Sequence, residues 1–392
     1  MPNYSYFSRL FTKEYAAFMD EVTSGLRLPD AKLLNALVFG IIRHGTAMVS
    51  HIARSAKSDD ESIHVAEHRL TDRLSTCDFS KALDKIDEIA ERHCYGDGLL
   101  VFDESDIQKP HGRKFEWLDI VQDGSEEGRP LGKGYHVVGI GLIGARKTPI
   151  PVRLYLYSTK RPGFKSSFEE AKGSVPSGRA ARISADRGFD SARWFSHFSG
   201  LSLEWVVRAK SLRKYSTRWG KLTSAEIQRR LKGRFSFRFT DPFKKEEVYV
   251  KATAVRVSHK DFGGAWLVCE YFPNEAEARG YVTPIDCSTR DGIEEALKCY
   301  RLRWRIEELF RFLKWAFGIE GIRVRTIRGQ NALLTAVLVA AAFLSTLIEG
   351  ETALYRACKE AWPSFKPDLS DEKLEEKYGH MPIELYHVKG GA

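Results

Sequence analysis

Apolar residues in the first 95 positions recur at the spacing of helices. One run places Leu33, Leu34, Leu37, Val38, Ile41 and Ile42 on a common helical face. Gly45 then interrupts the pattern, and a shorter run with Val49, Ile52 and Ala53 follows. We therefore predict a helical N-terminal domain over 1–95, with two short helices on either side of a glycine turn.

Strand-like patterns begin at Gly98. Three segments are rich in Val, Ile and Tyr: LLVFD (99–103), HVVGIGLIG (136–144) and IPVRLYLY (150–157). A short turn separates the second and third, which should form a hairpin. After them come a helical stretch at 167–172, a strand ARISAD at 181–186, a helix at 191–198 and a strand LEWVVRAK at 203–210. Hairpins followed by alternating strands and helices predict an α/β fold with a mixed sheet, whose first part is 96–210.

The segment 211–285 is β-rich, with the strand-like stretches RFSFRF, EVYVKATAVRV and WLVCEYF. No helix of useful length is evident between them, so we predict an all-β insertion. A long helical segment from Ile293 to Phe317 then begins the second part of the core, 286–350, and the polar tail is 351–392.

The longest apolar run is Ala332–Ile348. A helix of that length measures about 25 Å, which is short of a hydrocarbon core of roughly 30 Å. We predict a buried core helix and no membrane partner.

Basic residues are concentrated in one segment. The chain of 392 residues has a net charge of +9, and Arg208–Arg238 holds eleven basic residues against one acid. Trp219, Phe235 and Phe237 lie among them. Basic residues interleaved with aromatics suit a DNA backbone with bases stacked nearby, although a solvated face explains the segment equally well. The predicted DNA-binding residues here are Arg208, Arg229, Arg230, Lys232 and Arg234.

The N-terminal helices also admit a nucleic-acid interpretation. Two short helices around Gly45 resemble a helix-turn-helix, which places one helix in a major groove. A plain helical bundle packed on the next domain explains the pattern as well. The six cysteines show no CxxC spacing, and the first fifteen residues lack the apolar stretch of a signal peptide, so a reducing cytoplasm is expected.

Two aspartates end predicted strands. Asp103 closes LLVFD and Asp186 closes ARISAD, so both carboxylates should point from the carboxyl edge of the sheet, where α/β proteins bind ligands. Hard cations such as Mg²⁺ prefer oxygen ligands of this kind. Asp106 and Asp190 follow closely and compete for the same roles, although Asp also often stands at such junctions simply as a turn former.

A third carboxylate stands in the helical segment YRLRWRIEELFRFLK. Tyr300, Arg303, Glu307 and Lys314 fall within an arc of roughly 60° if the helix is continuous. An acid flanked by a phenol and two cations can bind metal while the cations hold phosphates. An amphipathic helix explains the neighbouring apolar face but gives no reason for this stripe.

The spacing Tyr-x2-Arg-x3-Glu-x6-Lys matches the signature of the "IS-four" group of insertion-sequence DDE transposases, which also contains the Tn-five enzyme. Other blocks of the family appear in order: DESDIQKP (103–110) followed by VQDGS and GKGYHVVG resembles the block around the first catalytic Asp. ADRGFDS (185–191) resembles the block around the second. The resemblance covers about residues 30 to 350.

This resemblance implies an RNase H-like core in which Asp103, Asp186 and Glu307 hold two Mg²⁺ ions, with Mn²⁺ able to replace them. It implies contacts of Tyr300, Arg303 and Lys314 with DNA near the scissile phosphate. The expected activity is cut-and-paste transposition: binding of terminal inverted repeats, cleavage and strand transfer, by a dimer on double-stranded DNA. Some relatives hold a flipped base against aromatics of the β insertion. Trp266 is the candidate here, although a strand Trp is more often part of a core.

Two other functions remain open on sequence grounds. One is a nuclease or resolvase of the same RNase H-like class, which cuts DNA without joining it. The other is a domesticated transposase that acts only as a DNA-binding protein. The presence of all three carboxylates argues against the latter.

Overall fold

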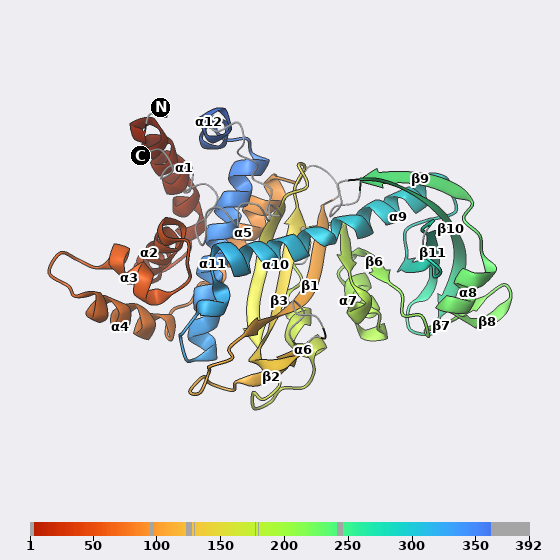
Figure 1. The fold of residues 1–392 in the computed structure, drawn as a ribbon, viewed down its shortest axis with the longest axis horizontal. Coiled ribbons are helices and arrows are strands. Elements are labelled where there is room, and N and C mark those ends of the chain that lie inside the picture. Colours follow the sequence, from red (N-terminus) through yellow and green to blue (C-terminus); the bar gives the residue numbers. More distant parts are fainter. Residues whose placement is uncertain are drawn as a thin grey trace. The chain divides into compact units, whose positions relative to one another are not determined.

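The computed structural model describes residues 4–94, 98–122, 128, 130–176, 178, 180–240, 246–273 and 275–361 (Figure 1). Contacts divide the chain into two compact units. Unit 1 comprises 1–95, 104–170 and 306–392, and unit 2 comprises 96–103 and 171–305. This division cuts across the five segments proposed from sequence, whose boundaries stay a prediction, and most of the predicted tail lies outside the described residues.

The N-terminal part of unit 1 is helical, as the apolar spacing predicts. Its helices are α1 (Tyr4–Thr23), α2 (Leu28–His44), α3 (Val49–Ala56), α4 (Ile63–Leu74) and α5 (Ser80–Arg92). Gly45 ends α2 with a φ of 60°, a left-handed conformation that glycine adopts without a Cβ penalty. The axes of α2 and α3 differ in direction by 108°, an angle within the range of helix-turn-helix motifs.

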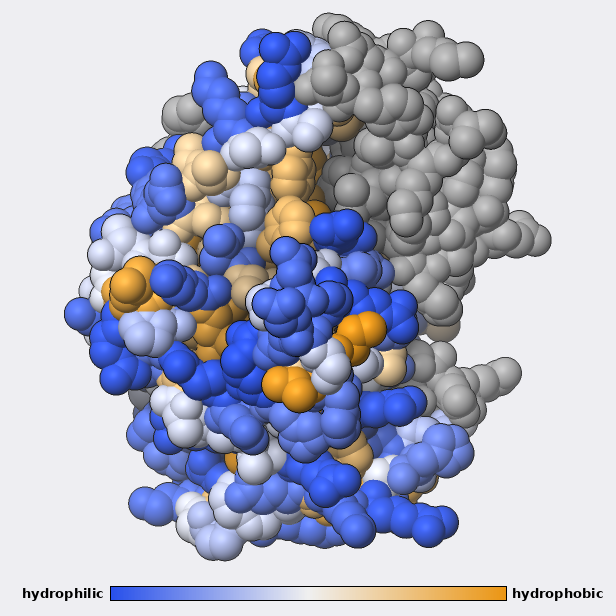
Figure 2. Space-filling model, turned by 90° about the vertical axis from the view of Figure 1, so that its left-hand side faces the viewer, coloured by the Kyte–Doolittle hydropathy of each residue, from blue (hydrophilic) through white to orange (hydrophobic). Residues whose placement is uncertain are grey.

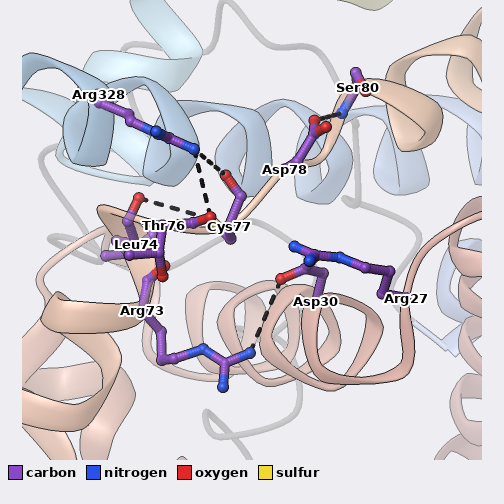
Figure 3. Close-up of polar contacts among 9 residues, drawn as sticks. All are labelled: Arg27, Asp30, Arg73, Leu74, Thr76, Cys77, Asp78, Ser80 and Arg328. Atoms are coloured by element: carbon purple, nitrogen blue, oxygen red, sulfur yellow. Dashed lines mark hydrogen bonds and ion pairs between the residues drawn. The ribbon is translucent and has the colours of Figure 1, made fainter.

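A polar cluster fixes these helices within unit 1 (Figure 3). Asp30 of α2 is buried and pairs with Arg27 at 2.7 Å and Arg73 at 3.9 Å. Arg328 of α11 (Ile327–Glu349) donates to the carbonyls of Thr76 and Cys77, which link α4 to α5. The helices are therefore packed on α11, as in the bundle interpretation.

The surface on the side of α1–α4 is mostly hydrophilic, with small separate hydrophobic areas (Figure 2). Exposed apolar residues in this part of the chain include Leu28, Ile63 and Val65. Among the described residues, this surface shows no broad apolar area of the kind that marks many protein interfaces.

The helix α11 is the buried core helix that the apolar run predicts, but the length argument was wrong. It has 23 residues and so measures about 35 Å, long enough for a bilayer. Within the protein, 83% of its most apolar window is buried, and it packs against β4 (Pro149–Tyr157), α2, α4 and α5. A helix that is apolar on all sides is stable in such a core.

The remaining elements of unit 1 form an antiparallel sheet with helices beside it. The strands are β2 (Asp119–Gln122), β3 (Leu131–Ile143) and β4, and β3 and β4 form the predicted hairpin. The helix α10 (Trp304–Ala316) begins in unit 2 and continues into unit 1, where η3 (Ile319–Gly321) and α12 (Ala353–Ala361) also lie. Gly139 of β3 faces Phe310 of α10, and a Cβ there would lie 2.4 Å from the ring.

Unit 2 combines parallel and antiparallel strands, which confirms the predicted mixed α/β fold. The first half of β1 (Leu99–Gln108) pairs in parallel with β5 (Arg182–Ala185), which pairs in parallel with β6 (Glu204–Arg208). The order then runs through β12 (Arg279–Thr283), β11 (Gly263–Tyr271), β10 (Glu247–His259), β7 (Lys214–Thr217) and β8 (Gly220–Thr223). The strand β9 (Phe235–Thr240) also pairs with β10. The strands predicted as an insertion thus continue the sheet of unit 2 beyond β6.

Short helices complete unit 2. They are η1 (Lys172–Ser174), η2 (Arg187–Phe189), α7 (Ala192–Gly200), α8 (Ser224–Arg230) and α9 (Arg290–Leu302). The helix α6 (Ser167–Ala171) lies in unit 1 except for its last residue. The helix α7 packs against β6, and α9 packs against β5 and β6.

Two sequence predictions about helices need correction. The segment 211–285 is not all-β, because Thr223 and Glu226 form a capping box that starts α8. The helix predicted from Ile293 to Phe317 is two helices. The amide of Arg303 bonds the carbonyl of Tyr300, three residues back, so α9 ends in a tighter turn before α10 begins. The predicted arc of four side chains assumed one continuous helix.

Candidate active site at the strand edge of unit 2

Three polar residues follow directly after paired positions of neighbouring parallel strands. Phe102 of β1 pairs with Ala185 of β5, and Ala185 pairs with Val207 of β6. Asp103, Asp186 and Arg208 are therefore next in register along one sheet edge. The strand β1 continues to Gln108, so Asp103 does not end the strand as predicted, but it ends the parallel ladder with β5. The register confirms that Asp103 and Asp186 share the carboxyl edge, where ligands bind in α/β proteins.

Asp103 is held by a cation. Its Oδ2 accepts a hydrogen bond from Nη1 of Arg303 at 2.9 Å, and both side chains are mostly buried. A charge-assisted bond in such surroundings fixes both groups more strongly than a surface pair does. The break between α9 and α10 thus places Arg303 against the first aspartate.

Asp186 is oriented by the short helix that follows it. Its Oδ1 accepts a hydrogen bond from the amide of Gly188 at 2.6 Å, so Asp186 caps η2. The side chain is half-buried, and it keeps one further oxygen for other ligands.

Tyr300 lies among the same charges. Burial raises the pKa of its hydroxyl, Asp186 adds to that effect, and the positive charges of Arg303 and Arg208 oppose it. The guanidinium carbon of Arg303 is 5.5 Å from the centre of the Tyr300 ring. Tyr300, Arg303 and Arg208 therefore cluster with Asp103 and Asp186 within unit 2.

The two competing aspartates have different surroundings. Asp190 is fully buried, pairs with Arg213 at 2.5 Å and accepts the amide of Lys210 at 2.6 Å. Asp106 is 7% exposed and accepts a hydrogen bond from Gln108 at 2.8 Å. Both carboxylates thus have partners inside the protein.

Glu307 and Lys314 belong to unit 1. Glu307 is half-buried in the first turn of α10. Nζ of Lys314, in the last turn, is 3.3 Å from Glu320 and 3.7 Å from Asp106. Their predicted roles as metal ligand and phosphate contact stay predictions.

The basic residues of the 208–238 segment are displayed on α8 and the stretch after it. Arg229 and Arg230 end α8, and Lys232 and Arg234 precede β9; all four are exposed. The guanidinium of Arg234 lies 4.9 Å from the Phe235 ring, which covers part of its charge.

Trp266 lies on β11, opposite Arg256 of β10, whose guanidinium is 5.5 Å from the indole ring. The side chain is half-buried. It is therefore neither fully part of the core nor an open stacking platform, and its predicted role with a flipped base stays a prediction.

The donor set at the strand edge suits a hard cation in part. Two carboxylates that follow the parallel ladder of β1 and β5 supply the oxygen ligands that Mg²⁺ prefers. Within the described ranges, no group of three or more His, Cys, Asp or Glu side chains could hold a metal ion. One oxygen of Asp103 binds Arg303, which would have to yield to a cation.

Sequence reasoning missed a charged network that anchors the strands around this edge. Arg213, besides pairing with Asp190, lies 3.9 Å from Asp261, which is 3.1 Å from His259. No local spacing in the sequence reports contacts between the loop after β6 and the β10–β11 turn.

Comparison with known families adds one similarity. Residues 160–343 match the family model described as the transposase DDE domain. The match includes Asp186, Arg208 and the whole Tyr-Arg-Glu-Lys spacing, but it begins after Asp103. A comparison with curated proteins found no match. Somewhat less than half of the chain is thus similar to the DDE domain of transposases.

Proposed function

We propose that this chain is a DNA transposase that binds terminal inverted repeats and catalyses metal-dependent strand cleavage and strand transfer. The observation that carries the proposal is the alignment of Asp103 and Asp186 at one end of adjacent parallel strands, with Arg303 and Tyr300 beside them. The match of 160–343 to the transposase DDE domain and the Tyr-Arg-Glu-Lys spacing support it independently.

Asp103, Asp186 and Glu307 are the proposed metal ligands, and Mg²⁺ is the proposed metal, with Mn²⁺ as a substitute. Support for Glu307 comes from its place in the spacing signature, four residues after Arg303. Held by these carboxylates, divalent ions would supply Lewis acidity for phosphoryl transfer.

The neighbouring side chains have complementary tasks in this proposal. Arg303 and Arg208 neutralise phosphate oxygens, because guanidinium groups bind phosphate in a fixed fork geometry. Arg303 exchanges its bond with Asp103 for one with DNA. Tyr300 is protonated at neutral pH, where its raised pKa lies even farther above the working pH than that of an ordinary tyrosine, so its hydroxyl can donate a hydrogen bond to a phosphate oxygen. Lys314 is proposed as a further phosphate contact.

DNA capture is assigned to exposed basic residues and to the N-terminal helices. Arg229, Arg230, Lys232 and Arg234 would follow the backbone of a transposon end or of target DNA. Joining two ends requires at least two copies of the chain, so a homodimer on DNA is proposed, acting in the cytoplasm at the nucleoid.

A cleavage and joining assay tests the proposal. Labelled DNA carrying both flanks of the reading frame is incubated with the protein, Mg²⁺ and a supercoiled target plasmid. A transposase releases 3′ ends at the flanks and transfers them to the plasmid, and Asp186→Asn does neither. Cleavage without joined products identifies a nuclease or resolvase. Binding without cleavage, in Mg²⁺ and in Mn²⁺, identifies a DNA-binding protein and rejects the proposal.

A further inference from the structure

Glu270 is a buried carboxylate in the middle of unit 2. It lies on β11 and is 2% exposed. Its Oε2 accepts a hydrogen bond from the hydroxyl of Tyr281 at 2.7 Å, and its Oε1 accepts one from Arg301 at 2.5 Å. Burying a carboxylate is costly unless its charge and hydrogen bonds are satisfied, and here both oxygens have partners.

Tyr281 transmits this contact toward the strand edge. Its side chain is almost fully buried on β12, and its ring centre is 4.3 Å from that of Tyr300. Burial and the adjacent Glu270 raise the pKa of the Tyr281 hydroxyl well above its usual value, so it remains a donor to the carboxylate. A ring fixed at its hydroxyl end leaves the packed Tyr300 little freedom to turn.

Arg301 provides a second connection. Its guanidinium lies 3.8 Å from the centre of the Phe239 ring and donates to Glu270, so it is held from two sides. Arg301 is in the last turn of α9, and Arg303 follows two residues later. Glu270 therefore also holds the end of the helix from which Arg303 reaches Asp103.

We propose that Glu270 is a positioning residue, which acts through Tyr281 and Arg301 to hold Tyr300 and Arg303 beside the strand-edge aspartates. This inference rests on the proposed function, since it assigns Glu270 a role in the same reaction. An alternative is that the buried group only stabilises the sheet. The positioning role predicts that removing the Tyr281 hydroxyl slows cleavage even when the protein stays folded. A purely stabilising role predicts no such loss of rate.

The chain offers a matched control for that experiment. Tyr271 lies next to Glu270 on β11, and its hydroxyl donates to the carbonyl of Gln228 on α8 at 2.8 Å. Tyr281→Phe and Tyr271→Phe each remove one hydroxyl hydrogen bond from the same sheet. Tyr281→Phe should cost more stability, because it leaves a buried Glu270 oxygen without its donor. If Glu270 only stabilises the fold, the two variants should nevertheless cleave DNA at equal rates wherever both are folded.

The first readout is the rate of first-strand cleavage at saturating DNA. Tyr281→Phe and Glu270→Gln should lower it by roughly 10- to 100-fold, because small misplacements of phosphate ligands reduce rates that strongly. The half-saturating DNA concentration should stay within about twofold, and Tyr271→Phe should match the wild type. Equal rates for Tyr281→Phe and Tyr271→Phe overturn the proposal.

The second readout does not depend on catalysis. In protein labelled with meta-fluorotyrosine, the fluorine resonance of Tyr300 is assigned by its loss in Tyr300→Phe. It should shift in Glu270→Gln and Tyr281→Phe but stay in place in Tyr271→Phe. An unmoved resonance in both test variants overturns the positioning role. Absence of cleavage by the wild-type protein instead rejects the transposase proposal, while the resonances still decide whether Glu270 positions Tyr300.

Discussion

Asp103 contrasts with Asp106, and Asp186 contrasts with Asp190, although the two residues of each pair lie in the same short motif. Asp103 and Asp186 are partly exposed at the end of the parallel ladder, where Asp103 binds Arg303 and Asp186 accepts the amide of Gly188 as the cap of η2. The other two are buried; Asp190 is enclosed by Arg213 and the amide of Lys210, and Asp106 by Gln108 and Lys314. The proposed metal ligands and the carboxylates buried within the fold thus differ in surroundings and not in residue type.

Neutralising Asp186 and Asp190 separately is the strongest test of this contrast. Asp186→Asn should slow strand cleavage by at least about 10³-fold, because a charge that stabilises the transition state is lost. Its unfolding free energy should change by no more than about 0.5 kcal/mol, since Asn caps a helix as well as Asp. Cleavage assays and urea unfolding measure the two quantities. Persistent Mg²⁺-dependent cleavage would remove Asp186 from the site.

Asp190→Asn should change the unfolding free energy strongly and the rate of strand cleavage little. The variant removes the nearest carboxylate from Arg213, whose side chain is 14% exposed, and leaves Asp261 at 3.9 Å and the Asp190 carbonyl as its partners. It should lose up to about 3 kcal/mol of unfolding free energy. Burial raises the pKa of Asp190 despite the nearby cations, so the ionised carboxylate is itself costly inside the protein. The loss in Asp190→Asn is therefore expected from the missing partner of Arg213.

The double variant Asp190→Asn/Arg213→Met isolates that cause. It should recover much of the lost stability, because removing both partners of a buried ion pair costs less than removing one. If the double variant is as unstable as the sum of the two single variants, the ion pair is not the anchor described here.

Local patterns predicted the parts of the fold that depend on local periodicity. The β3–β4 hairpin, the helices before residue 95 and the buried helix α11 follow from apolar spacing alone. The placement of Asp103 and Asp186 at one edge of the sheet followed from the expectation that an aspartate after an apolar strand points from its carboxyl edge.

Other features depend on contacts that spacing does not report. The strand β1 continues through the polar residues after Asp103 and is followed by a bond from the Lys109 amide to the Lys133 carbonyl. No Gly or Pro marks the helix break at Arg303. Glu270 and Arg301 meet only in the folded chain. The helix α8 is different, because the capping box Thr-Ser-Ala-Glu that starts it was readable in the sequence.

Lys109 extends the comparison to cations, since it follows Asp103 and Asp106 in the same motif but is only 5% exposed. Its ammonium donates to the carbonyls of Glu320 at 2.6 Å and Ile322 at 2.8 Å. Burial lowers its pKa from 10.5 to about 8, so between these pH values the unfolded chain binds a proton that the folded chain has released. Stability from this residue therefore rises with pH across that window.

The measurement is the difference in unfolding free energy between the wild type and Lys109→Met. In urea titrations, this difference should shift in favour of the wild type by about 2 kcal/mol between about pH 7.5 and about pH 10. Titration of the tyrosines and cysteines cancels in the difference. A pH-independent difference would mean that Lys109 keeps the pKa of a solvated lysine and that its burial does not perturb it.

The smallest expected effect concerns the exposed cations Arg229 and Arg230, which contrast with the buried Arg213. Arg229→Gln/Arg230→Gln should leave unfolding unchanged and weaken DNA binding. Each lost phosphate contact lowers the slope of log affinity against log salt by about 0.9, so the slope should fall by up to about 1.8. The control Lys147→Gln/Lys165→Gln removes the same charge from exposed positions of unit 1. If both pairs alter the slope equally, net charge attracts DNA, and α8 is an ordinary solvated face rather than a binding surface.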